Sequence, residues 1–202
     1  MNERRRRMLD AGIQLFGDRG FTAVSITDIC GRARVSRRSF YEEFAGLDRL
    51  LMSIVDEKDM IAVERVAASL AASTGEHIQT RAARAFEAFL SATCPDRLTA
   101  RVCFVEVVRV ADTVEAWRRE RRRRLAALLV FEAESAAQRG EIAPGSYEFA
   151  AITVVGAVTY AIQEWTESAP IYGEFTDMSI ARLAERLAQI FLACVNSAAT
   201  QP

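Results

Sequence analysis

Residues 25–44 constrain the fold of this chain more than any other stretch, because they contain two helix starts separated by a short break. Ser25 is a favourable N-cap, and Asp28, three residues later, places a carboxylate at the positive end of the helix dipole. Ser36 supplies a second N-cap after the break at residues 34–35. Each predicted helix has apolar residues at helical spacing: Ile26, Ile29, Cys30 and Ala33 in the first, and Phe40 and Phe44 in the second. The pattern predicts two short helices joined by a tight turn.

The polar residues of the second helix favour contact with DNA. Arg37, Arg38, Ser39 and Tyr41 place cations and hydroxyls at its N-terminal end or outer face. Such groups donate hydrogen bonds to base edges and phosphates, and the helix dipole favours a phosphate at that end. The same residues also fit an ordinary helical hairpin with a solvated basic face, because the spacing of helix-turn-helix motifs is loose.

Several short motifs extend this pattern over most of the first fifty residues. They are LFGDRGF at 15–21, SITDIC at 25–30, A-x-V-S at 33–36, S-F-Y-x-x-F at 39–44, and the leucine pair at 50–51. Taken together from Arg4 to Leu51, they resemble the N-terminal domain of the TetR family of helix-turn-helix transcriptional regulators. The resemblance implies an all-α fold, with a three-helix DNA-binding domain followed by a C-terminal helical domain for ligand binding and dimerisation.

The residues of this module that are expected to bind DNA are Ser25, Thr27, Arg34, Ser36, Arg37, Arg38, Ser39 and Tyr41. Two positions depart from the family pattern. Arg34 stands in the turn where the family usually has glycine, and a left-handed backbone there costs a non-glycine residue about 1 kcal/mol. Leu47 stands where the family often has a lysine that contacts phosphate. Glu42 and Glu43 add negative charge to the second helix, and they either discriminate between DNA sequences or point to solvent.

Charge is divided unevenly along the chain. The whole chain has a formal net charge of −1, but residues 1–50 hold ten arginines and seven acidic residues, a net charge of +3. A mildly basic module on an acidic body fits a localised contact with nucleic acid. The cluster Arg4 to Arg7 is either a solvated end or an arm that reaches phosphates or the minor groove.

The rest of the chain is expected to be helical. A long helix within residues 48–75 connects the DNA-binding domain (residues 1–47) to the body (residues 76–202). Further helices are predicted at residues 78–90, 102–110, 117–138, about 147–166 and 177–195. The valine-rich segment 102–110 fits a strand on propensity alone, but a helix is preferred because no partner strand is apparent. Six arginines within residues 118–124 favour a solvated face with i,i+4 ion pairs over a second contact with DNA, although some of them must lie over apolar surface.

The helices at about 147–166 and 177–195 predict a homodimer. The first has an apolar stripe that includes Val158 and a second side of small residues around Gly156, and the other helix repeats the stripe around Leu187. A helix that is apolar on two sides has more surface to bury than its own domain offers. A four-helix interface with a second copy is therefore expected, and the family resemblance implies the same arrangement.

Large aromatic residues in the middle helices, accompanied by a few polar ones, suggest a ligand site. Core packing accounts for most of them, but a mostly apolar cavity with a few orienting polar groups is the usual design of such a site. The candidate pocket residues are Phe86, Phe89, Phe104, Glu106, Trp117, Phe131, Thr159, Tyr160, Gln163 and Trp165.

The expected function is a repressor that a small apolar or aromatic effector releases from a palindromic, double-stranded DNA operator. The connector helix is the expected lever between effector and DNA. Two alternatives stay open: a TetR-like regulator without a small-molecule inducer, and a helical protein-interaction module that needs no DNA.

The chain contains no motif that favours an enzyme. It has no glycine-rich phosphate loop, G-x-S-x-G elbow or H-E-x-x-H, and its only histidine, His77, is expected at a helix start. The four cysteines lack metal-ligand spacing and are expected to be buried free thiols, so neither a metal nor a cofactor is predicted. No signal peptide or membrane span is apparent, and a cytoplasmic protein is expected.

Overall fold

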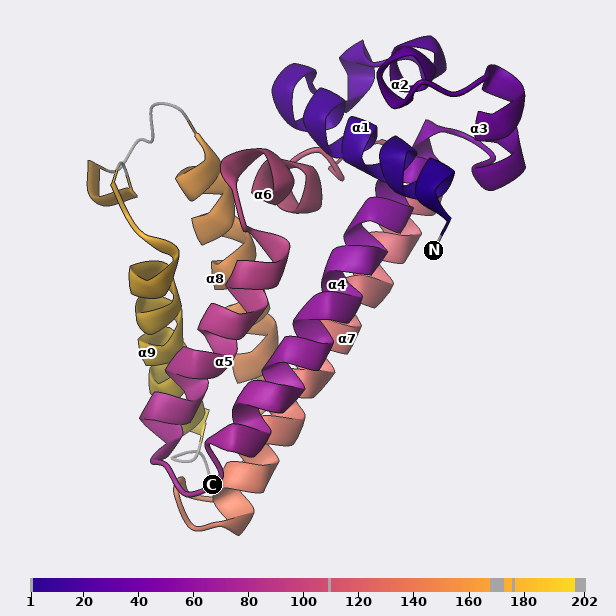
Figure 1. The fold of residues 1–202 in the computed structure, drawn as a ribbon. Helices are drawn as coiled ribbons and strands as arrows, with labels where there is room; N and C mark the ends of the chain where they lie inside the picture. Colours follow the sequence, from indigo (N-terminus) through magenta and orange to yellow (C-terminus); the bar gives the residue numbers. More distant parts are fainter. Residues whose placement is uncertain (1, 109, 168–172, 176, 199–202) are drawn as a thin grey trace.

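The computed structural model describes residues 2–108, 110–167, 173–175 and 177–198, and every regular element in these ranges is a helix. This confirms the expected all-α fold. Figure 1 shows a small head formed by the N-terminal helices and an elongated body along which α4 (Leu47–Ala72) and α7 (Asp112–Gln138) run. None of the described helices is both long and apolar enough to cross a membrane.

The head consists of α1 (Glu3–Arg19), a 3-10 turn η1 (Phe21–Ala23), α2 (Ile26–Ala33) and α3 (Arg37–Glu43). α1 packs against both α2 and α4, and their apolar faces share one core. Full burial of such a side chain contributes about 1.5–3 kcal/mol, which lets short helices keep a fixed arrangement. The fully buried side chains of this core are Met8, Phe16, Ile29, Phe40, Leu50 and Leu51.

α4 belongs first to the head and then to the body. Beyond its first turns it packs along α5 (Ile78–Thr93), which runs beside it in the body (Figure 1). His77 caps α5, because its Nδ1 accepts a hydrogen bond from the backbone N–H of Gln79 at 3.3 Å. The expected place of His77 at a helix start is thus confirmed.

The body is completed by α6 (Arg97–Phe104), α7, α8 (Glu148–Thr166) and α9 (Ile180–Ala198), with a 3-10 turn η2 (Gly173–Phe175) before α9. α8 contacts α6, α7 and α9, and α9 also packs against α5. The helices enclose one apolar interior, whose fully buried side chains include Leu90, Ile162, Leu183 and Leu187.

The apolar stripes of α8 and α9 that predicted an interface face this interior. Val158 and Leu187 are both buried within a single chain, because α5 and α6 close the body against these helices. The sequence pattern therefore identified core positions. The exposed apolar residues of α8, among them Phe149, Ile152 and Tyr160, lie outside this interior.

The helix predicted at 102–110 is displaced, because α6 spans Arg97–Phe104 and ends before most of that segment. The backbone N–H of Glu106 donates to the carbonyl of Arg101 at 3.0 Å, which closes α6, and residues 105–108 form a turn. β-branched valines in this turn lower its helix propensity. Arg109 lies outside the described residues.

All four cysteines are free thiols, as expected, but only three of them are buried. Cys30, Cys94 and Cys103 lie in the interior, and Cys194 is partly exposed. Within the described ranges, no three His, Cys, Asp or Glu side chains gather where a metal ion could be held.

Candidate nucleic-acid interface

α2 begins with a capping box at the predicted position. The backbone N–H of Asp28 donates to Ser25 Oγ at 3.2 Å, and the backbone N–H of Ser25 donates to the Asp28 carboxylate at 2.9 Å. These bonds satisfy N–H groups that the first helical turn leaves without a partner. Hydrogen bonds from the hydroxyl and the backbone N–H of Ser25 lower the pKa of the Asp28 carboxyl below its ordinary value.

Arg34 ends α2 in the left-handed conformation that the turn requires. Its φ of 54° and ψ of 52° make it the only non-glycine residue with a positive φ in the described part of the chain. Its N–H donates to Gly31 O at 3.3 Å, and that of Val35 donates to Cys30 O at 3.0 Å. The conformation costs about 1 kcal/mol, and it leaves an exposed arginine at the tip between the two helices.

α3 buries one aromatic side and exposes the other. Ser36 caps it by accepting a hydrogen bond from the backbone N–H of Ser39 at 3.0 Å. Phe40 is fully buried, and the centroid of its ring lies 5.8 Å from that of Phe44. Because Phe40 fixes one side of α3 in the core, the opposite side of the helix faces solvent. The exposed residues there are Arg37, Arg38 and Tyr41.

The eight residues predicted to bind DNA lie on α2, on α3 or at the residues that cap and join these two helices. Seven of them are exposed: Ser25, Thr27, Arg34, Ser36, Arg37, Arg38 and Tyr41. Ser39 is half-buried, and its Oγ accepts hydrogen bonds from the Ser36 hydroxyl at 3.0 Å and from Arg4 at 3.5 Å. Ser39 is therefore engaged within the protein before any DNA arrives.

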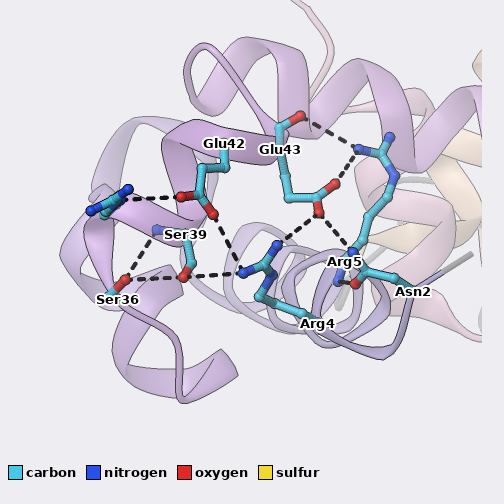
Figure 2. A network of polar contacts seen from close by, with 8 residues as sticks. Asn2, Arg4, Arg5, Ser36, Ser39, Glu42 and Glu43 are labelled. Carbon is cyan, nitrogen blue, oxygen red and sulfur yellow. Dashed lines mark hydrogen bonds and ion pairs between the residues drawn. The ribbon is translucent and has the colours of Figure 1, made fainter.

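The N-terminus of α1 lies against the C-terminal end of α3, a contact that the sequence analysis missed. Figure 2 shows the Arg4 guanidinium between two carboxylates, 3.4 Å from that of Glu42 and 3.6 Å from that of Glu43. Arg5 lies 3.5 Å from the Glu43 carboxylate. These two arginines are helical and paired, so they form neither a disordered tail nor a free arm. The only signal in the sequence is the opposite charge of the two segments.

Glu106, expected in the ligand pocket, lies at the junction of head and body. Its carboxylate accepts a hydrogen bond from the backbone N–H of Phe21 at 2.7 Å and pairs with Arg101 at 2.9 Å. Nearby, Gly17 approaches α6 so closely that a Cβ there would lie 2.9 Å from atoms of Leu98. α6 and the turn after it are thus in direct contact with the helices that carry the recognition module.

The remaining candidate pocket residues occupy four environments. Those in the core are Phe86, Phe104 and Trp165, with Phe89 partly buried. Two side chains bridge elements, because Trp117 donates to Asp56 at 3.0 Å and Gln163 donates to the carbonyl of Phe104 at 3.0 Å. Thr159 donates to the carbonyl of Val155 in its own helix. The last two lie on the surface: Phe131 and Tyr160.

Two hollows lie near these residues. The first is a cavity of about 20 Å³ lined by two of the candidate pocket residues, Phe104 and Thr159. Arg118 and Arg121 also line it. An open groove of about 690 Å³ runs between α7 and α8 and includes Phe131.

Arg121 departs from the expected solvated face of α7. Its Nε and Nη2 donate to the Asp59 carboxylate of α4 at 2.7 and 2.9 Å, and its Nη1 donates to the carbonyl of Cys103 at 3.4 Å. Burial acts to lower the pKa of Arg121, but the hydrogen bonds and charge of Asp59 outweigh it and raise that pKa. Because the arginines of residues 118–124 surround α7, at least one of them must face α4. That residue is Arg121, and the carboxylate it contacts is that of Asp59.

Comparison with known proteins agrees with the geometry of the head. A model of the family described as bacterial regulatory proteins, tetR family, matches residues 8–54. Over 53 residues the chain is 36% identical to an uncharacterized HTH-type transcriptional regulator, YerO, of Bacillus subtilis (strain 168). That match covers 26% of this chain and 18% of the length of YerO.

Solved structures share the fold over nearly the whole chain. The fatty acid degradation regulator FadR from Bacillus halodurans superposes with a TM-score of 0.78 at 14% identity, covering 95% of this chain and 96% of that one. FadR from Bacillus subtilis, solved in complex with stearoyl-CoA, gives 0.75 at 15% identity, with coverages of 93% and 97%. A TetR-like regulator from Rhodococcus sp. RHA1 gives 0.64 at 26% identity, with coverages of 94% and 96%. These relatives are transcriptional regulators rather than enzymes.

Proposed function

We propose that this chain is a transcriptional repressor of the TetR family, released from a palindromic operator by a small apolar or aromatic effector, because residues 8–54 match the model of the tetR family of bacterial regulatory proteins. The observation that carries the proposal is the pair of capped helices α2 and α3 joined at Arg34, with arginines and hydroxyls exposed on both helices and in the turn. We expect the protein to act in the cytoplasm, where it meets DNA.

In this proposal α3 enters the major groove of the operator. Arg37 and Arg38 are the candidates for base or phosphate contact, since arginine donates two parallel hydrogen bonds to guanine. Ser36 and Tyr41 offer hydroxyls to phosphates, which fix the position of the helix without reading the sequence.

Selection from a random DNA pool at moderate salt tests this role. We expect one enriched motif. Arg37→Ala at a base contact should weaken binding by about 1–3 kcal/mol and relax specificity at one position, whereas Tyr41→Phe should weaken all sequences alike. Arg84→Ala removes an exposed arginine from α5 and is the matched control, with no change in affinity expected. A pool without enrichment would contradict DNA recognition and favour an interaction module.

The homodimer is proposed to form through the outer side of α8 and the adjoining part of α7. Gly156 lies in the middle of this side with open space at its Cβ position, although glycine in a helix costs up to about 1 kcal/mol relative to alanine. Close approach of a second helix would account for it. The exposed fractions of the apolar residues around it are 83% for Phe149, 64% for Ile152, 56% for Tyr160 and 67% for Phe131.

The substitution Ile152→Arg should produce a monomer, because burial of an unpaired charge in an apolar interface costs more free energy than the interface provides. Met60→Arg, at an exposed apolar residue of α4, is the matched control and should stay dimeric. Light scattering at micromolar concentration distinguishes the two states. The monomer should also lose affinity for the inverted repeat, since each chain reads one half-site. A monomeric wild-type protein would refute this part of the proposal.

The effector is proposed to bind in the body and to act through the contacts that join the body to the head. The aromatic interior supports an apolar ligand, and FadR from Bacillus subtilis, which shares the fold, was solved with stearoyl-CoA. Because the cavity beside Phe104 holds only about 20 Å³, a ligand there must move α6, α7 or α8. Movement of α6 would shift Glu106, which holds the backbone N–H of Phe21 in the head.

A compound screen by thermal shift, followed by operator release, tests the effector. For each tenfold loss of DNA affinity, the effector must bind the DNA-released conformation about 1.4 kcal/mol more tightly than the DNA-bound one. A compound that stabilises the protein and releases the operator supports induction. If every stabilising compound leaves the operator fully bound, the protein is a regulator without a small-molecule inducer.

A further inference from the structure

The recognition helix α3 carries no net formal charge. Its two arginines, Arg37 and Arg38, are balanced by Glu42 and Glu43 within a single seven-residue helix. Carboxylates so close to the DNA-facing side repel phosphates unless cations lie against them. The inference drawn from this rests on the proposed DNA-binding function.

Arg4 supplies such a cation from outside α3. Its Nη1 lies 3.4 Å from Glu42 Oε2 and donates to Ser39 Oγ at 3.5 Å, while its Nη2 lies 3.6 Å from Glu43 Oε1. Figure 2 shows these three partners converging on the one guanidinium. One side chain of α1 thus contacts three side chains of α3.

The position of Arg4 is fixed by its neighbours. Asn2 caps α1 by accepting a hydrogen bond from the backbone N–H of Arg5 at 2.9 Å, and its amide donates to Glu43 at 2.9 Å. The Arg5 guanidinium lies over the Phe44 ring, 4.5 Å from its centroid, and also contacts Glu43. The Glu43 side chain is only 16% exposed, so its carboxylate is held toward α1.

α3 depends on such support because a helix of seven residues does not persist alone in water. Ser36 caps its start, and Phe40, its only buried residue, holds its middle. The contacts of Arg4 and its neighbours hold its end.

We propose that Arg4 is a positioning residue for DNA recognition. It holds the last turn of α3 against α1 and does not itself contact phosphate. It also contributes to neutralising the two carboxylates, together with Arg38, which lies 3.2 Å from Glu42, and Arg5, which lies 3.5 Å from Glu43.

Affinity for the selected operator tests the neutralising role. Arg4→Gln should weaken binding about tenfold. The triple variant that also carries Glu42→Gln and Glu43→Gln should bind at least about threefold more tightly than Arg4→Gln alone, because the repelling carboxylates are gone. Arg7→Gln, at an exposed arginine of the same helix, is the control for lost charge and should not be rescued by the glutamate substitutions. A direct phosphate contact would instead lower the slope of log K against log salt by about 0.9 without rescue, which would overturn the proposal.

Amide hydrogen exchange of the DNA-free protein tests the positioning role independently of any operator. Arg4→Gln should speed exchange at the end of α3 several-fold and leave α2 unchanged, since local opening depends on local contacts. Unchanged exchange at the end of α3 would overturn the proposal even if DNA binding holds. If selection finds no operator, the proposed function fails while this measurement still decides whether Arg4 positions α3. All variants should fold, because the pairs that Arg4 makes are partly exposed and add little to stability.

Discussion

Replacement of Asp59 by alanine should lower the free energy of unfolding by about 3–4 kcal/mol. Asp59 on α4 receives two hydrogen bonds from Arg121 on α7, and the two side chains are 17% and 7% exposed. Without Asp59 the Arg121 guanidinium remains buried. It keeps the carbonyl of Cys103 at 3.4 Å and the ring of Phe104 at 4.9 Å as partners, but it has no opposite charge in contact.

The magnitude follows from this burial. Removal of one member of a buried ion pair costs about 3–5 kcal/mol, and the partial exposure of Asp59 places the expectation in the lower half of that range. Glu120→Ala, which removes an exposed pair with Arg123, is the control and should cost less than about 0.5 kcal/mol. Asp59→Leu combined with Arg121→Met leaves no buried charge at this position, so the double variant should be more stable than Asp59→Ala.

Urea denaturation at one fixed protein concentration measures these differences, because the stability of a dimer depends on concentration. In a thermal melt of a chain this long, the loss corresponds to a midpoint about 6–16 °C lower. A cost below about 1 kcal/mol for Asp59→Ala would refute the reasoning. So would a double variant as unstable as the single one, because the penalty would then not come from an unpaired charge.

Three further outcomes are expected. Arg34→Gly should raise the free energy of unfolding, measured by urea denaturation, by about 0.5–1 kcal/mol, because glycine adopts the left-handed turn without strain. It should also weaken operator binding, measured by fluorescence anisotropy, because a cation is removed. Glu106→Ala should cost about 1–3 kcal/mol in urea denaturation, because the backbone N–H of Phe21 loses its acceptor, whereas Glu106→Gln should cost less than half as much. Burial raises the pKa of the Cys94 and Cys103 thiols to about 12, so they stay protonated when folded but ionise near pH 9 when unfolded. Stability should therefore fall between pH 9 and 12 by about 1.4 kcal/mol per pH unit for each thiol, and the double alanine variant should flatten this dependence in melts at several pH values.

The sequence alone determined the features whose partners lie a few residues apart. The N-cap at Ser25 with Asp28 in the first turn, the cap at Ser36 and the helix start at His77 are found where the residue types predicted them. The left-handed turn at Arg34 was indicated by the family pattern and not by the residue itself. A helix terminus selects its cap through hydrogen bonds within one turn, so the short sequence around it is sufficient. The apolar periodicity predicted most of the helices for the same reason, because it depends on spacing along one element.

Tertiary structure decided the features whose partners lie far apart in the chain. Arg4 contacts Glu42 and Glu43, Arg121 pairs with Asp59, and Glu106 accepts a hydrogen bond from the backbone N–H of Phe21. The stripe of α8 around Val158 became core, and its opposite side stayed exposed. Periodicity shows that a helix has an apolar face, but which neighbour covers that face depends on how all the helices pack. A charged side chain is placed by the same packing, because its burial is stable only where the assembled helices bring a carboxylate or carbonyl to it.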